Sequence, residues 1–158
     1  MINGTIRVVQ SDGSGGWYVG GQFSKVGSYT RNGIVHIYSN GTVNPDWDPN
    51  AGTNKNVYSI SVNGSDIYVG GDFTTIGGQA RNRLAKLNNT NGNANASWNP
   101  NADGVVVSIT ASGTDVFAGG YFSTVNGSVT RNRIAKFNNS NGNADATWNP
   151  NSNGAPNV

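Results

Sequence analysis

Arginines recur along this sequence at a nearly fixed spacing and could form an anion-binding site. Arg31, Arg81 and Arg131 each precede an asparagine, and Arg83 and Arg133 follow two of them by two residues. Residues two apart in a strand share a face, and a guanidinium group binds carboxylate or phosphate in a bidentate manner. Acidic polysaccharide is the ligand expected of such a site. The alternative, which we favour, is that each arginine ties a loop to backbone carbonyls or to an aspartate of its own repeat.

Aromatic side chains offer a second chemistry, the stacking of sugar rings. Trp47, Trp98 and Trp148 occupy one recurring position, which favours packing between neighbouring units, because large aromatic side chains bury roughly 150–250 Å² each. Trp17 and Tyr121 interrupt the recurrence, since the other copies have no aromatic residue at these places. We therefore take these two residues as the candidates for glycan binding.

The sequence gives little support for a catalytic or a metal-binding site. His36 is the single histidine, and the sequence has no cysteine and no glutamate, so a histidine-centred triad or a zinc site lacks partners. Asp46 and Asp48 could form a carboxylate pair, but the other copies have neutral residues there. The asparagine-rich stretches 88–95 and 138–145 resemble calcium loops only superficially, because calcium prefers several carboxylates. We expect a protein that is not an enzyme and that needs no cofactor or metal.

All these candidates lie in a unit of about 50 residues that is repeated three times, which is typical of repeat architectures. Each copy carries a Gly-Gly-x-Phe motif, an Arg-Asn pair and a Trp-x-Pro-Asn motif. In such architectures a unit buries its apolar faces against its neighbours. The Gly-Gly-x-Phe positions, which we expect to be structural, are Gly20, Gly21, Phe23, Gly70, Gly71, Phe73, Gly119, Gly120 and Phe122.

The second copy predicts four strands. Residues 57–62 and 66–73 are rich in β-branched and aromatic residues and are separated by an Asn-Gly turn. Residues 74–80 are expected to be a loop, followed by a strand over 82–87 and a fourth strand over 94–98, which a proline ends. Four antiparallel strands joined by hairpin turns make one blade of a β-propeller.

The motif Asp66–Phe73, the Arg-Asn-Arg-Leu-Ala-Lys-Leu run and the Trp-Asn-Pro motif carry a family resemblance. Together they resemble the delta-60 type bacterial propeller repeat and, through the Gly-Gly pair, more distantly kelch blades. The turns at 62–64 and 88–92 depart from the Pro-Asp-Gly turns usual in that family. The resemblance implies a β-propeller of secreted bacterial proteins and brings no catalytic residues.

Composition agrees with an all-β fold and restricts the partners. The chain has 158 residues, among them 26 asparagines and 23 glycines, both poor helix formers. Its net charge of +2 and its 11% of charged residues are far from the basic stripe of a nucleic-acid-binding protein, and no apolar run is long enough for membrane insertion. Met1–Thr5 has no signal-peptide character. A surface rich in Asn, Gly, Ser and Thr still favours an extracellular or cell-surface location.

The number of repeats predicts assembly. We expect a single propeller module over residues 1–158, with blades at about 5–52, 53–104 and 105–158. Rings of about 4–8 blades are typical, so two chains arranged head to tail would close a six-bladed homodimer. Alternatively, the chain is a fragment of a longer propeller. We predict a non-catalytic binding or scaffold module, with a lectin-like propeller, or a fragment of a larger secreted enzyme or surface protein, as the alternatives.

Overall fold

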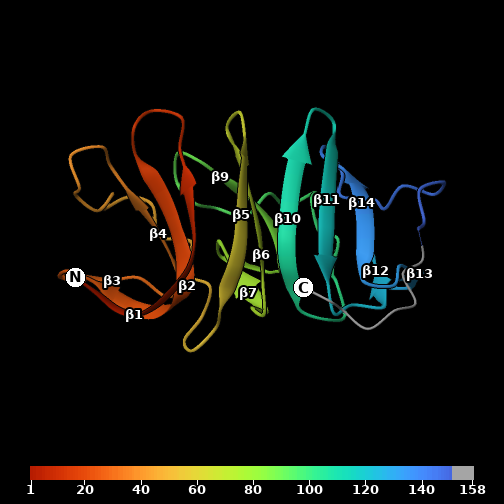
Figure 1. Cartoon of the computed structure of the whole chain (residues 1–158), viewed down its shortest axis with the longest axis horizontal. Helices are drawn as coiled ribbons and strands as arrows, with labels where there is room; N and C mark the ends of the chain where they lie inside the picture. The colour runs from red at the N-terminus through yellow and green to blue at the C-terminus, as the bar shows by residue number, and fades with distance from the viewer. Residues whose placement is uncertain (151–158) are drawn as a thin grey trace.

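The computed structural model describes residues 1–150, which contain β-strands and no helix. Ten of the strands form three twisted antiparallel sheets that stand side by side in chain order, as Figure 1 shows, and the other four form two small two-stranded sheets. The all-β, antiparallel propeller architecture expected from the sequence is therefore confirmed. Within the described part of the chain, no helix is long and apolar enough to cross a membrane.

Blade 1 comprises β1 (Ile2–Ser11), β2 (Trp17–Val26), β3 (Tyr29–Thr30) and β4 (Ile34–Ile37). Strand β2 lies in the middle and pairs with β1 on one side and with β4 on the other. The short β3 continues the ladder along the far end of β2. Two register shifts in the β1–β2 pairing bend this long hairpin.

Blade 2 repeats this topology with β5 (Val57–Asn63), β6 (Asp66–Gly71) and β9 (Leu84–Asn88) in the main sheet. A separate small hairpin is formed by β7 (Thr75–Ile76) and β8 (Gln79–Ala80). Strand β5 lies between β1 and β10 at the inner side of the three sheets (Figure 1).

Blade 3 has the same arrangement, with β10 (Val106–Ser112), β11 (Asp115–Gly120) and β14 (Ile134–Asn138) in its main sheet. Its small hairpin consists of β12 (Thr124–Val125) and β13 (Val129–Thr130). The equivalent elements of blades 2 and 3 therefore superpose in order, in pairing and in register, as their sequence identity requires.

The fourth strand expected over 94–98 is reduced to a single bridge between Ala94 and Leu87. The reason lies in side-chain hydrogen bonds that compete with the ladder. The side-chain oxygen of Asn95 accepts from the backbone N–H groups of Ser97 and Trp98, which turns the chain. The carbonyl of Asn95 is meanwhile bound by Arg81.

Two further local expectations are corrected. The loop expected over 74–80 holds the β7–β8 hairpin, whose turn residues Gly77 and Gly78 both have positive φ, the backbone that two-residue hairpins prefer. The strand expected from residue 82 begins only at Leu84, because Arg83 has φ of 64°. Arg81 and Arg83 therefore do not share a strand face.

The core consists of layers between consecutive sheets, and we call these layers the first joint (blades 1 and 2) and the second joint (blades 2 and 3). Trp47 and Tyr18 of blade 1 pack on Ile67, Val69 and Leu87 of blade 2 in the first joint. The second joint repeats the pattern between blades 2 and 3. Its largest buried side chains are Tyr68, Leu84, Trp98, Val116, Phe122 and Phe137.

In the Gly-Gly pairs of blades 1 and 2, the first glycine permits the close approach of the next sheet. A Cβ placed on Gly20 would lie 2.6 Å from a methyl group of Val57, and one on Gly70 would lie 2.7 Å from a methyl group of Val106. The second glycine faces a backbone carbonyl of its own blade, which a Cβ at Gly71 would strike. Both glycines are therefore required by packing.

Candidate functional site

The joints carry the polar chemistry of this molecule as well as its core. At the second joint the indole Nε1 of Trp98 donates to the carbonyl of Asn138, at 3.0 Å. At the first joint Trp47 makes the same bond to Asn88, also at 3.0 Å. Trp47 and Trp98 thus each lie in a joint and are anchored to the following blade.

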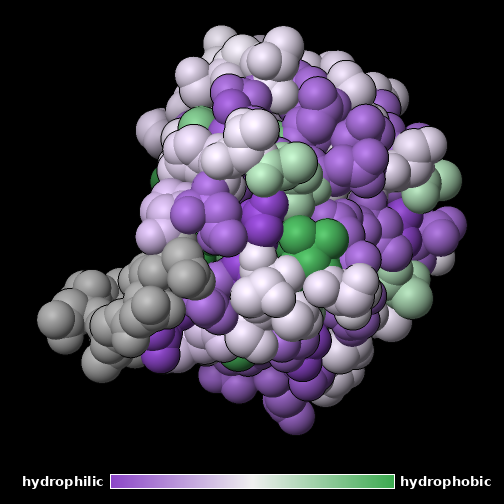
Figure 2. Space-filling view, turned by 90° about the vertical axis from the view of Figure 1, so that its right-hand side faces the viewer, coloured by the Kyte–Doolittle hydropathy of each residue, from purple (hydrophilic) through white to green (hydrophobic). Residues whose placement is uncertain are grey.

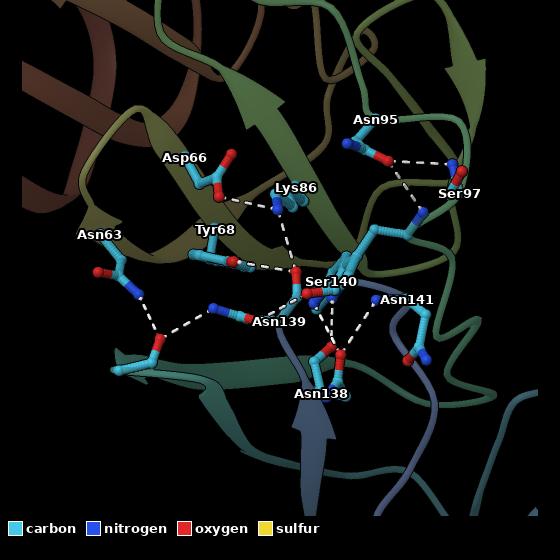
Figure 3. Close-up of polar contacts among 12 residues, drawn as sticks. Asn63, Asp66, Tyr68, Lys86, Asn95, Ser97, Asn138, Asn139, Ser140 and Asn141 are labelled. Carbon is cyan, nitrogen blue, oxygen red and sulfur yellow. Dashed lines mark hydrogen bonds and ion pairs between the residues drawn. The ribbon is translucent and has the colours of Figure 1, made fainter.

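A buried lysine closes one end of the second joint, as Figure 3 shows. The ammonium group of Lys86 lies 2.8 Å from a carboxylate oxygen of Asp66 and donates to the carbonyl of Asn139 in blade 3, at 3.0 Å. It also lies 5.7 Å from the ring centre of Tyr68, whose hydroxyl donates to the same carbonyl at 3.4 Å. Burial and the negative charge of Asp66 raise the pKa of Tyr68 to about 12.

The first joint has a histidine where the second has that lysine. His36 and Lys86 hold the same register position in their blades, opposite Tyr18 and Tyr68. The Nε2 atom of His36 lies 2.9 Å from a carboxylate oxygen of Asp12, and the imidazole stacks on Tyr18 with ring centres 4.6 Å apart. The acid–base pairing is therefore retained with different side chains.

The hydrogen bonds around His36 determine its tautomer. Its Nδ1 atom lies 3.1 Å from the amide nitrogen of Asn44, which can only donate. The orientation of that amide is set because its oxygen accepts from the N–H of Asp46. Nδ1 therefore accepts a hydrogen bond, and Nε2 carries the proton and donates to Asp12. Neither ring nitrogen keeps a free lone pair with which it could take the proton of a catalytic serine hydroxyl.

Asp12 is held in its charged form. Burial by itself raises the pKa of this carboxyl, but hydrogen bonds from His36 and from the N–H groups of Ser14 and Gly16 outweigh burial, so its pKa lies below the ordinary value. The two N–H groups donate to Oδ1 at 2.7 and 2.8 Å. Asp12 thus places a carboxylate charge at this end of the first joint.

Next to this pair lies a cavity of about 280 Å³. Asp12, Tyr18, His36 and Tyr38 of blade 1 line it, and Asn89 lines it from blade 2. Asn89 is the counterpart of Asn139, which receives the lysine at the second joint.

The three recurring arginines are buried and hold loops together. Arg81 donates to the carbonyls of Ala80, Asn95 and Ala96. Arg31 and Arg131 lie in the same place and also bind backbone carbonyls. Because these donors point into their own blades, the geometry favours loop tying over the exposed ring of guanidinium groups.

The other sequence candidates lie apart from one another. Trp17 and Tyr121 are exposed and stand on blades 1 and 3. Asp48 forms an ion pair with Arg31 at 3.4 Å, and no interaction joins it to Asp46 among residues 1–150. The asparagine-rich turn that begins at Asn88 uses the side-chain oxygen of Asn88 to accept from its own backbone.

The pair of Asp12 and His36 was not a sequence candidate. Asp12 lies in the longer first turn of blade 1, a stretch without counterpart in the other copies, and His36 replaces a lysine that the other copies share. Both departures from the repeat are visible in the sequence. Their proximity follows only from the pairing of β2 with β4.

Comparison with known proteins agrees with this architecture. A family model described as a β-propeller domain of unknown function, DUF5122, matches residues 10–46, 66–97 and 116–147, which together make up more than half of the chain. The three matched segments fall on the three blades, one on each. A search of curated proteins finds no match.

Proposed function

Because this chain belongs to the DUF5122 family of β-propeller domains, we propose that it is a non-catalytic binding or scaffold module that pairs head to tail with a second copy. Each chain supplies three blades, and two chains complete a ring of six. Rings of about 4–8 blades are typical of propellers. A tail-to-head contact repeated by a twofold axis closes such a ring.

The observation that carries this proposal is an unfinished joint on blade 3. Phe117, Ile134 and Trp148 hold the positions at which blade 2 has Tyr68, Leu84 and Trp98. The three residues of blade 2 are fully buried in the second joint, whereas those of blade 3 are only partly covered. We call the surface formed by Phe117, Gly119, Ile134 and Trp148 the open face of blade 3.

Figure 2 views the molecule from the side of blade 3 and shows apolar atoms in the middle of this face with polar side chains around them. The rings of Phe117 and Trp148 pack edge to face, with centres 5.4 Å apart. This pairing repeats that of Tyr68 and Trp98, at 5.3 Å. The open face thus has the geometry of a joint and lacks its second side.

Gly119 gives the same evidence of an uncovered surface at the level of a single residue. A Cβ on Gly70 would meet Val106 of the next blade. A Cβ on Gly119 would have no neighbour closer than 3.8 Å within residues 1–150, and the nearest atom, the carbonyl oxygen of Arg133, belongs to blade 3 itself. The space that a following blade fills at the two inner joints is open at Gly119.

Blade 1 offers the matching side. Val57 and Ile60 of β5, which enter the first joint, are 0% and 4% exposed. Their counterparts in β1, Ile6 and Val9, are 48% and 53% exposed. Trp17, in the position of the buried Ile67, is also exposed. Burial of such apolar area is the main driving force of association.

Hydrogen-bonding groups on the two faces also correspond. At the second joint the hydroxyl of Ser59 accepts from the N–H of Ile109, at 3.1 Å. The counterparts at the joint between two copies are Ser108 of one chain and Val9 of the other. Trp148 would likewise donate to the carbonyl at position 38 of the second copy, as Trp98 does to Asn138.

The solution mass tests this proposal. Analytical ultracentrifugation over a range of protein concentrations is expected to give twice the chain mass of 16.5 kDa. A monomer at all concentrations, with a low melting temperature, would instead support the alternative that the chain is a piece of a longer propeller.

Tyr121 favours a second candidate function, glycan binding. It is 53% exposed, departs from the repeat, and lies outside the open face of blade 3. Exposed aromatic rings suit the stacking of sugars. A glycan array with the wild type and with Tyr121→Ala tests this: binding that the substitution weakens would support a lectin. The polar composition also leads us to propose an extracellular or cell-surface location for the module.

A further inference from the structure

We propose that the cavity at the first joint binds a small primary amine, whose ammonium group takes the place that the ammonium of Lys86 takes at the second joint. This inference does not depend on the ring, because every residue of the cavity belongs to blades 1 and 2 of one chain. It rests on a comparison of the two joints, which have the same arrangement of strands but carry His36 in one and Lys86 in the other at the same register position.

The second joint shows what this plan provides for an ammonium group. Lys86 is held by the carboxylate of Asp66, by the carbonyl of Asn139 and by the ring of Tyr68. A carboxylate, a carbonyl and an aromatic ring together suit an ammonium group, which has three N–H donors and a positive charge.

The first joint also has a carboxylate, a carbonyl and an aromatic ring, but His36 stands where the second joint has the ammonium group of Lys86. Asp12 supplies the carboxylate and Asn89 the carbonyl, which accepts no hydrogen bond within residues 1–150. The imidazole of His36 covers Tyr18, but the ring of Tyr38 is partly exposed at the rim of the cavity, 5.3 Å from the imidazole. Because the side chain of His36 is shorter than that of Lys86, a cavity remains beyond its imidazole ring.

The electrostatics of the cavity favour a cation. Asp12 is ionised and its side chain is only 10% exposed, and the amide of Asn44 holds His36 in the orientation that donates to Asp12. Two N–H groups occupy Oδ1, and one donor, His36, occupies Oδ2. Oδ2 therefore keeps one lone pair for a further donor. The negative charge of Asp12 also contributes to raising the pKa of Tyr18 to about 12, after the larger effect of burial.

The size of the cavity limits the ligand. At about 280 Å³ it lies just below the usual range for ligand pockets. An alkylamine and an amino sugar both fit this description, and both present the same ammonium group. The experiment therefore includes one of each.

The test is a titration of the whole chain, followed by isothermal calorimetry and by the amide NMR signals of Ser14 and Gly16, whose N–H groups bind Asp12. The ligands are n-butylamine and glucosamine, with n-butanol and glucose as uncharged controls. We expect the amines to bind and the controls not to bind. Binding of only one amine would identify the source of the ammonium group, whereas no binding of either amine at tens of millimolar would overturn the proposal.

His36→Lys is the matched variant, because blades 2 and 3 have lysine at this position and fold with it. The new ammonium is expected to fill the site and to weaken amine binding at least about tenfold. Asp12→Asn is the second variant: it keeps an oxygen for the N–H groups of Ser14 and Gly16, removes the charge, and should weaken binding to a similar extent. Amine binding that remains unchanged in both variants would place it elsewhere and overturn the proposal.

Discussion

The indole nitrogen of Trp98 lies 3.0 Å from the carbonyl oxygen of Asn138, a residue of the following blade. Alongside the contact of Lys86 with Asn139, this indole bond links the two blades across the second joint. Trp47 and Asn88 repeat it at the same distance. The chain therefore contains two finished copies of an interface, against which its third tryptophan can be compared.

We expect Trp98→Phe to lower the free energy of unfolding by about 2 kcal/mol, because it removes a buried hydrogen bond and leaves a void. Trp148→Phe is the matched control. In a monomeric chain it should cost less than about 1 kcal/mol, since Trp148 is partly exposed. Urea unfolding measures both. Equal costs at low protein concentration would contradict the idea that the open face is uncovered in the monomer.

Gly119→Ala should prevent assembly without disturbing the blade. The added methyl group has no atom of residues 1–150 closer than 3.8 Å, but it occupies the space into which Ile6 of a second copy would pack. Sedimentation should therefore show a shift from dimer to monomer.

The control for Gly119→Ala is Gly70→Ala, whose methyl group would lie 2.7 Å from Val106. Overpacking of this kind costs about 2 kcal/mol, so this variant should have a lower melting temperature. If Gly119→Ala leaves the mass unchanged, the ring is closed in another way or not at all.

Arg81→Lys should destabilise the chain by about 2 kcal/mol, because lysine cannot reach three carbonyls that converge on a planar guanidinium group. Arg83→Gly is a useful contrast. It removes one bond to Ala102 but also relieves a positive φ, so its net effect should stay within about 1 kcal/mol. Chemical denaturation compares the two. Loss of binding to acidic polysaccharide in Arg81→Lys, without loss of stability, would restore the anion-binding hypothesis.

Acid should unfold the wild type in part through Asp103. Burial raises the pKa of this carboxyl, but hydrogen bonds from the hydroxyl and N–H of Ser123 and from the N–H of Thr124 lower it to about 2. Since the folded pKa lies below the ordinary 3.8, the stabilisation is complete above pH 3.8 and is lost as the pH falls towards 2.

In Asp103→Asn this part of the acid dependence should disappear, so stability should change less between pH 4 and pH 2 than in the wild type. Because Asp103 is exposed to solvent, the difference should be smaller than the pKa shift alone implies. Thermal melting at a series of pH values measures it, and parallel profiles for the two proteins would show that Asp103 does not contribute.

Local patterns in the sequence predicted the main hairpin of blade 2, but they missed the β7–β8 hairpin, which lies in a predicted loop, and the ends of the strands. The Asn-Gly turn between β5 and β6 and the β-branched and aromatic residues on both sides of it indicated a hairpin correctly. The fourth strand predicted over 94–98 is reduced to one bridge, because Asn95 and Arg81 withdraw its backbone groups from the ladder. A hydrogen bond to an arginine 14 residues away in the sequence has no local signature.

For the candidate residues as well, the sequence indicated the role of some and not of others. The recurrence of Trp47 and Trp98 indicated the joints, because a repeated large apolar residue must be buried against a neighbour. The recurrence of Arg81 did not reveal whether its guanidinium group faces solvent or the backbone. That choice depends on where three carbonyls converge, which is a property of the folded blade.

By itself the sequence determined the number of units, their β character and the places where they touch, since repetition and strand patterning are local properties. Only the tertiary structure decided which side chains meet across a joint. It put Asp12 against His36, left a cavity where the next joint holds Lys86, and left no atom of residues 1–150 closer than 3.8 Å to a Cβ on Gly119. These relationships arise from the packing of one sheet on the next. Packing brings together residues whose positions in the sequence do not indicate that they are in contact.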